Sequence, residues 1–151
     1  MDEFTVRSII PLAQPEVEVL LAESRREGFR FLDRLHADFE SDANRFDAPG
    51  EALLGVYRGS ALIAVGGLNR DPYVGDARTG RLRHLYVHPE LRGKGIGRVL
   101  VDALMAEALS HFDVLRLRTD TAAAARFYEA LGFVPESSPT ATHLRVLRGA
   151  S

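Results

Sequence analysis

Cysteine is absent from the 151 residues of this sequence. That absence excludes disulfides, thiolate metal sites and an acyl-cysteine intermediate. The five histidines are scattered and show no paired spacing with acidic residues, so we expect no metal site. Any acyl transfer by this chain is therefore expected to proceed by direct attack on the donor.

Long apolar runs and a strong excess of one charge are also missing. No run approaches the ~20 apolar residues of a membrane span, and the net charge of −2 with a pI near 6.2 argues against broad nucleic-acid binding. The acidic start, Met1-Asp2-Glu3, is unlike a signal peptide. We expect a cytoplasmic protein without nucleic-acid or membrane partners, folded as a single domain over residues 1–151.

Lysine is nearly absent, and the single lysine, Lys94, lies in the most distinctive stretch of the chain. Residues 82–104 read LRHLYVHPELRGKGIGRVLVDAL: an apolar strand, a break at Pro89, a basic glycine-rich turn and an amphipathic helix. Glycine lets a backbone adopt strained dihedrals and approach a ligand closely. The first amides of a helix are unpaired, and they attract anions together with the helix dipole. This turn is therefore predicted to bind phosphate.

Two common phosphate motifs do not fit the turn. A P-loop requires Ser or Thr after its lysine, whereas Gly95 follows Lys94. A dinucleotide fingerprint would begin at Gly93, but Arg98 stands where its third glycine belongs. The ligand of this turn is thus expected to be neither a P-loop nucleotide nor a dinucleotide.

The spacing Arg92-x-x-Gly95-x-Gly97, directly after the strand sequence LYVHP, resembles the acetyl-CoA motif of the GNAT superfamily of N-acetyltransferases. Further on, residues 125–133 read ARFYEALGF and resemble the second signature of that family, a helix that carries a tyrosine and ends at Gly-Phe. The two signatures occur in the family's order. The resemblance covers nearly the whole chain.

Hydrophobic periodicity predicts a strand, two helices, three strands, a helix, a strand, a helix and two strands. Residues 41–50 are predicted to form a polar surface loop, residues 114–119 a strand, and Gly66-Gly67 a bulge or a close backbone approach. This order resembles the GNAT fold. The resemblance implies an α/β (α+β) fold with a mixed, mostly antiparallel sheet of about seven strands and about four helices. It also implies that the sheet splays after its fourth strand, leaving a V-shaped gap for pantetheine.

The family resemblance also implies a set of cofactor-binding residues. The CoA pyrophosphate is expected on the backbone amides of the turn, and the pantetheine along the fourth strand. The expected residues are Leu85, Tyr86, Val87, Arg92, Gly93, Lys94, Gly95, Ile96, Gly97, Arg98, Thr121, Ala124, Phe127 and Tyr128. Thr121 stands where many relatives have asparagine, and it is also expected to cap the helix that begins at Ala122.

Tyr128 matches the family tyrosine that stands near the CoA sulfur and protonates the departing thiolate. The alternative is a tyrosine that only packs beside Phe127 and Leu131. The resemblance does not assign the general base that would deprotonate the amine. Arg81 occupies the position at which some relatives carry a glutamate, and arginine cannot accept a proton. His84 is the candidate base, with a hydrogen-bonded core histidine, water or an amine that arrives neutral as alternatives.

The acceptor is expected between the two early helices, the loop before the central strand and the last strands. Acidic residues there could form a rim that attracts a cationic amine, but Arg34 and Arg45 interrupt it, which favours a solvated surface instead; the acidic residues are Asp38, Glu40, Asp42, Asp47 and Glu51. The leading hypothesis is an N-acetyltransferase, monomeric or homodimeric, that transfers acetyl from acetyl-CoA directly to a primary amine of a small molecule or protein. The alternative is a catalytically weak acyl-CoA-binding or sensor module.

Overall fold

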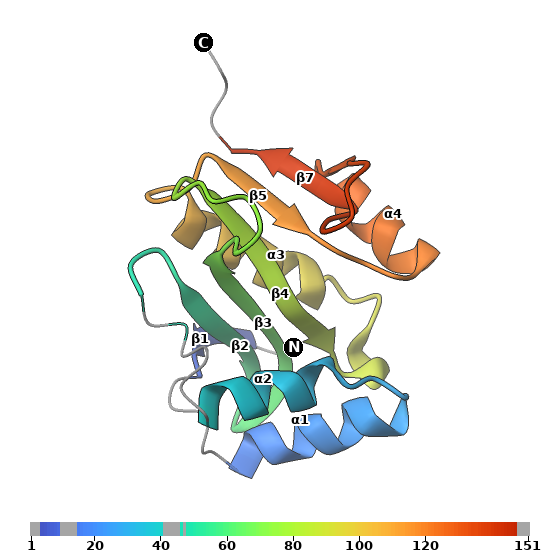
Figure 1. Cartoon of the computed structure of the whole chain (residues 1–151). Coiled ribbons are helices and arrows are strands. Elements are labelled where there is room, and N and C mark those ends of the chain that lie inside the picture. The colour runs from blue at the N-terminus through green and yellow to red at the C-terminus, as the bar shows by residue number, and fades with distance from the viewer. Residues whose placement is uncertain (1–3, 10–14, 41–45, 47, 148–151) are drawn as a thin grey trace.

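The computed structural model describes residues 4–9, 15–40, 46 and 48–147. Within these residues, seven strands form one sheet in the order β1-β2-β3-β4-β5-β7-β6 (Figure 1). The strands are β1 (Phe4–Ser8), β2 (Ala52–Arg58), β3 (Ala61–Arg70), β4 (Thr79–Val87), β5 (Val114–Leu117), β6 (Val134–Pro135) and β7 (His143–Val146). All neighbours are antiparallel except β4 and β5, which are parallel. The mixed, mostly antiparallel sheet predicted from the sequence is confirmed.

Helices cover both faces of this sheet (Figure 1). The described residues form α1 (Pro15–Arg26), α2 (Phe31–Glu40), the short 3-10 helix η1 (Pro89–Leu91), α3 (Ile96–Ala108) and α4 (Ala122–Ala130). Ile96, Leu100 and Leu104 recur every fourth residue, which gives α3 one apolar face that packs on the sheet. Leu20 and Leu32 of α1 and α2 pack with Tyr86 in a second apolar cluster. The two clusters lie on opposite faces of the sheet.

The bulge predicted at Gly66-Gly67 is confirmed, since the register of β3 against β4 shifts between Val65 and Gly67. On the facing strand, His84 has a positive φ of 59°. Leu82 and Leu85 consequently both pack in the α3 cluster, although regular alternation would place them on opposite faces. A Cβ at Gly66 would lie 2.9 Å from Leu85 Cδ1, so a larger residue would displace that side chain.

The sheet splays between β4 and β5. These strands pair only from Thr79↔Val114 to Arg81↔Arg116, whereas β4 remains paired with β3 as far as Val87. In the described part of the chain, the edge of residues 82–87 that faces β5 therefore has no strand partner. The splay after the fourth strand is confirmed, and its open edge is the feature that positions the candidate site.

Two local predictions are wrong in part. Phe46 lies within the predicted polar loop, yet it is 1% exposed and its ring fills the space above Gly67, where a Cβ would lie 2.7 Å from Phe46 Cε1. Residues 48–50 form a bend and turns, as predicted, and residues 41–45 and 47 lie outside the described residues. The strand predicted over residues 114–119 ends at Leu117, and the Thr119 amide donates instead to the Thr142 side chain.

Candidate active site

The glycine-rich turn leads into α3 with two left-handed residues. Gly93 and Gly95 have φ of 79° and 80°, a region that disfavours any residue with a Cβ, and a Cβ at either position would meet nothing within 4 Å. Gly95 is the N-cap of α3 and provides no side-chain cap. The amides of residues 93–98 donate to no acceptor among the described residues. This end of α3 therefore presents unpaired donors into open space, as an anion site requires.

Gly97 is required for a different reason, namely close packing. A Cβ at this position would lie 3.1 Å from Phe127 Cζ and 3.6 Å from Val87 Cγ2. The start of α3, the end of β4 and helix α4 thus meet at Gly97. Three of the residues predicted to bind the cofactor are brought together here from separate parts of the sequence, and the open edge of β4 runs directly into the turn.

Tyr128 points from α4 into the core beside this junction. It is 7% exposed, and its ring lies edge-on to Phe127 and Phe133, with centroid distances of 5.0 and 5.6 Å. Burial raises the pKa of the Tyr128 phenol well above its ordinary value, because the anion would be poorly solvated. The phenol is therefore protonated near neutral pH.

Thr121 caps α4 as predicted, since its Oγ1 accepts a hydrogen bond of 3.1 Å from the Ala124 amide. His88, next to the turn, has a similar local role, because its Nδ1 accepts a hydrogen bond of 3.2 Å from the Glu90 amide and caps η1.

His84 is half-buried on the open stretch of β4, with its ring edge-on to Phe46 at a centroid distance of 6.1 Å. Of the two histidines on β4 and its C-terminal end, only His84 lies within the strand.

The positive charge of the turn is smaller than the sequence indicates. Arg92 donates from Nη1 and Nη2 to Glu27, at 2.8 and 2.6 Å, and from Nε to the Val87 carbonyl at 3.0 Å. This ion pair, followed by the hydrogen bond from Tyr86, lowers the pKa of Glu27. Lys94 and Arg98 are exposed. Sequence analysis missed Glu27, because it lies 65 residues before its partner.

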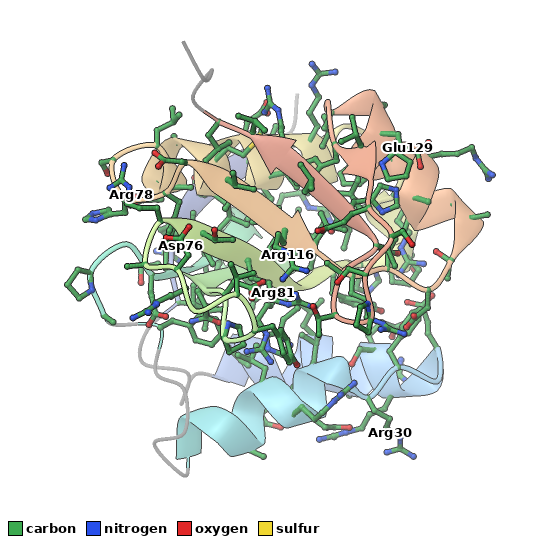
Figure 2. The ribbon with its side chains drawn as sticks, turned by 45° about the horizontal axis from the view of Figure 1, so that its top comes forward. Arg30, Asp76, Arg78, Arg81, Arg116 and Glu129 are labelled. Atoms are coloured by element: carbon green, nitrogen blue, oxygen red, sulfur yellow. The ribbon has the colours of Figure 1, made fainter. Side chains whose placement is uncertain are left out.

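A buried ionic network, also missed, occupies the point where β4 and β5 separate (Figure 2). Asp71 has no exposed side-chain surface, and it lies 3.2 Å from both Arg81 and Arg116, which are register partners on the two strands. Arg81 also donates to the Thr140 carbonyl at 2.7 Å. Arg81, which occupies the position of a family acid, is thus ion-paired with Asp71. It lies at the last paired position of β4 and β5, where the gap begins.

The predicted acidic rim is described only at Glu51, whose Oε2 accepts from Asn69 Nδ2 at 3.0 Å and from the Arg70 amide at 3.2 Å. Glu51 thus links the start of β2 to the end of β3, and the side chains of the other predicted rim acids lie outside the described part. Among the described residues, no group of acids and histidines could hold a metal ion. No helix there is long and apolar enough to cross a membrane.

Residues 17–133 match the Acetyltransferase (GNAT) family. The chain therefore belongs to the GNAT acetyltransferase family, whose general reaction is acetyl transfer from acetyl-CoA to an amine. No curated protein is similar enough to the chain to count as a match.

Solved structures show the same fold. A protein from Exiguobacterium sp. 255-15, provisionally described as an acetyltransferase, is 33% identical, with a TM-score of 0.84 over 95% of this chain and 93% of that one. The ribosomal-protein-S18-alanine N-acetyltransferase from Escherichia coli is 18% identical, with a TM-score of 0.71 over 99% and 97% of the two chains. Ard1 from Thermoplasma volcanium is 18% identical, with a TM-score of 0.72 over 97% and 99%. These last two likenesses concern the fold alone.

Proposed function

We propose that residues 1–151 act as one domain that transfers an acetyl group from acetyl-CoA directly to a primary amine of a small molecule or protein. The observation that carries this proposal is the junction at Gly97, where the unpaired amides of α3, the open edge of β4 and the tyrosine-bearing helix α4 meet. Membership of the GNAT family supports the reaction type.

The residues present fit acetyl-CoA, which supplies an activated thioester when bound. The amides of residues 93–98 would hold the pyrophosphate, with Lys94 and Arg98 close by. Backbone groups of Leu85 and Val87 would pair with the pantetheine amides along the open edge of β4, much as a strand pairs with a peptide. The fit is supported by the open space above Gly93 and Gly95.

The chain's own proton donor in this proposal is Tyr128, which protonates the departing thiolate. The hydroxyl is protonated at neutral pH, and the proton that the attacking amine loses restores it after it has protonated the thiolate. Arg81 is held by Asp71 and does not act as a base. An amine that arrives neutral needs no dedicated base, and His84, on the open stretch of β4, is the protein group to test for that role.

The second candidate function is a catalytically weak acyl-CoA-binding or sensor module. It is favoured by one observation, the arginine that is committed to Asp71 in the position where some relatives carry an acid. Incubating the protein with acetyl-CoA and a panel of primary amines, while thiol release is monitored, separates the two functions. Amine-dependent thiol release supports the acetyltransferase, and acetyl-CoA binding without such release supports the module.

A further inference from the structure

The link between α1 and α2 is fastened to the glycine-rich turn through one carboxylate. Glu27, directly after α1, accepts hydrogen bonds from both terminal nitrogens of Arg92 and from the hydroxyl of Tyr86. The Arg92 guanidinium lies 5.4 Å from the centroid of the Tyr86 ring. These three residues, Glu27, Tyr86 and Arg92, come from three separate elements and are called the Glu27 latch below.

The latch engages Arg92 on all three of its guanidinium nitrogens, because Nε donates to the Val87 carbonyl while Nη1 and Nη2 donate to Glu27. Bidentate pairs of arginine with a carboxylate are among the stronger hydrogen-bonded contacts in proteins. Arg92 would have to give up this pair to turn towards the amides of α3. Lys94 and Arg98, by contrast, have no ion pair with a described residue.

The latch also lies at the gap. Tyr86 belongs to the apolar cluster on the α1 and α2 face, and Phe29 packs edge-on against it at a centroid distance of 6.1 Å. Tyr86 itself is part of the stretch of β4 that has no β5 partner. Residues 27–29 therefore border the gap on the face opposite α3. An amine that approaches the gap from that face passes this link.

We propose that Arg92 is a positioning residue for the acceptor: through Glu27 it holds residues 27–29 against the open stretch of β4, and it does not bind the cofactor phosphates with its side chain. This inference rests on the proposed function, because it assumes that an amine enters the gap beside the link. It assigns two charged residues of the turn region to different tasks, Lys94 to phosphate and Arg92 to the acceptor side.

The first test uses Arg92→Gln, Glu27→Gln and the double variant, with Lys94→Gln as a matched control in the same turn. Calorimetry should give a CoA dissociation constant within about threefold of wild type for both latch variants, and a weaker one for the control. Amide hydrogen exchange at residues 27–29 should be about tenfold faster or more in each latch variant and unchanged in the control. The double variant should exchange no faster than either single variant, because both substitutions break one unit.

A phosphate-binding Arg92 would give the opposite pattern. Arg92→Gln would then weaken CoA about tenfold or more, while Glu27→Gln would tighten it by freeing the guanidinium. That result would overturn the inference, as would unchanged exchange at residues 27–29. Both measurements are independent of turnover, so they decide the role of Arg92 even if no amine is acetylated and the proposed function fails.

The second test follows turnover with an amine that the panel identifies. The latch variants should raise the KM for the amine by about tenfold, with the KM for acetyl-CoA within about threefold of wild type. Arg92→Lys keeps the charge but loses the bidentate geometry, so it should restore the KM only in part. An unchanged KM for the amine in both variants would contradict the acceptor-side role.

Discussion

Tyr128 and His84 are the two side chains for which we propose or test a role in the chemistry of the site. Tyr128 is buried, protonated and enclosed by aromatic rings. His84 lies at a positive φ on the open stretch of β4. Neither arrangement by itself distinguishes a catalytic group from a packing group, so each role stays a prediction that one substitution can decide.

Replacing Tyr128 by phenylalanine removes one hydroxyl and keeps the ring that packs against Phe133. If the hydroxyl protonates the thiolate, kcat should fall by about 10²- to 10⁴-fold, while the dissociation constant for CoA changes little. Steady-state kinetics combined with calorimetry would check both quantities. A kcat within a few-fold of wild type, with chemistry rate-limiting, would remove Tyr128 from the mechanism and strengthen the binding-module alternative.

Activity should rise with pH towards the pKa of the free amine, without an inflection that belongs to a protein base. This follows from Arg81, which is held by Asp71 and cannot accept a proton. A pH profile of kcat/KM for wild type and His84→Ala would check it, and the two profiles should have the same shape. Loss of turnover in His84→Ala with intact acetyl-CoA binding would show that His84 is the base.

Among the strands, β4 and β5 are paired only at their first residues, where Asp71 forms ion pairs with Arg81 of β4 and Arg116 of β5. Beyond these residues the two strands separate. Asp71→Asn would remove the acidic partner of the buried Arg81 and leave the adjacent Arg116 paired with Glu136 alone. Breaking a buried ion pair in this way costs about 3–5 kcal/mol of the free energy of unfolding, which urea denaturation would measure. Arg78→Gln is the matched control, because it breaks the exposed Arg78–Asp113 pair and should lower the free energy of unfolding far less. Equal costs would contradict a special role for Asp71.

The stability that the α1–α2 link contributes to the fold should depend on pH, because it depends on the ionisation of Glu27. The pKa of Glu27 is lowered in the folded protein, mainly by Arg92, so its contribution to stability is present above the unfolded pKa and lost as pH falls through the folded one. The stability difference between wild type and Glu27→Gln should therefore be constant near neutral pH and shrink below roughly pH 5. Urea denaturation at several pH values would check this. A difference that grows on acidification would contradict the sign.

At the scale of the whole molecule, local features of the fold could be predicted from the sequence. The Thr121 cap and the Gly66-Gly67 bulge follow from residues next to one another in the chain, and the splay followed from the family resemblance. The buried Phe46 and the Asp71 network did not, because both depend on contacts between distant segments. Glu27 was missed for the same reason. The spacing of residues along the sequence identifies local motifs, but it does not identify which distant charged side chains form ion pairs.

In the proposed function, the glycine-rich turn and the gap beside it form one acetyl-CoA site. Calorimetric titration of acetyl-CoA into wild type and Gly95→Trp tests it most directly, because Gly95 has a φ of 80° and open space where a ligand would lie. Wild type should bind with micromolar to millimolar affinity that weakens as salt is added, since phosphate contacts supply much of the attraction. Gly95→Trp should not bind. Undiminished binding by a folded Gly95→Trp variant would contradict the claim.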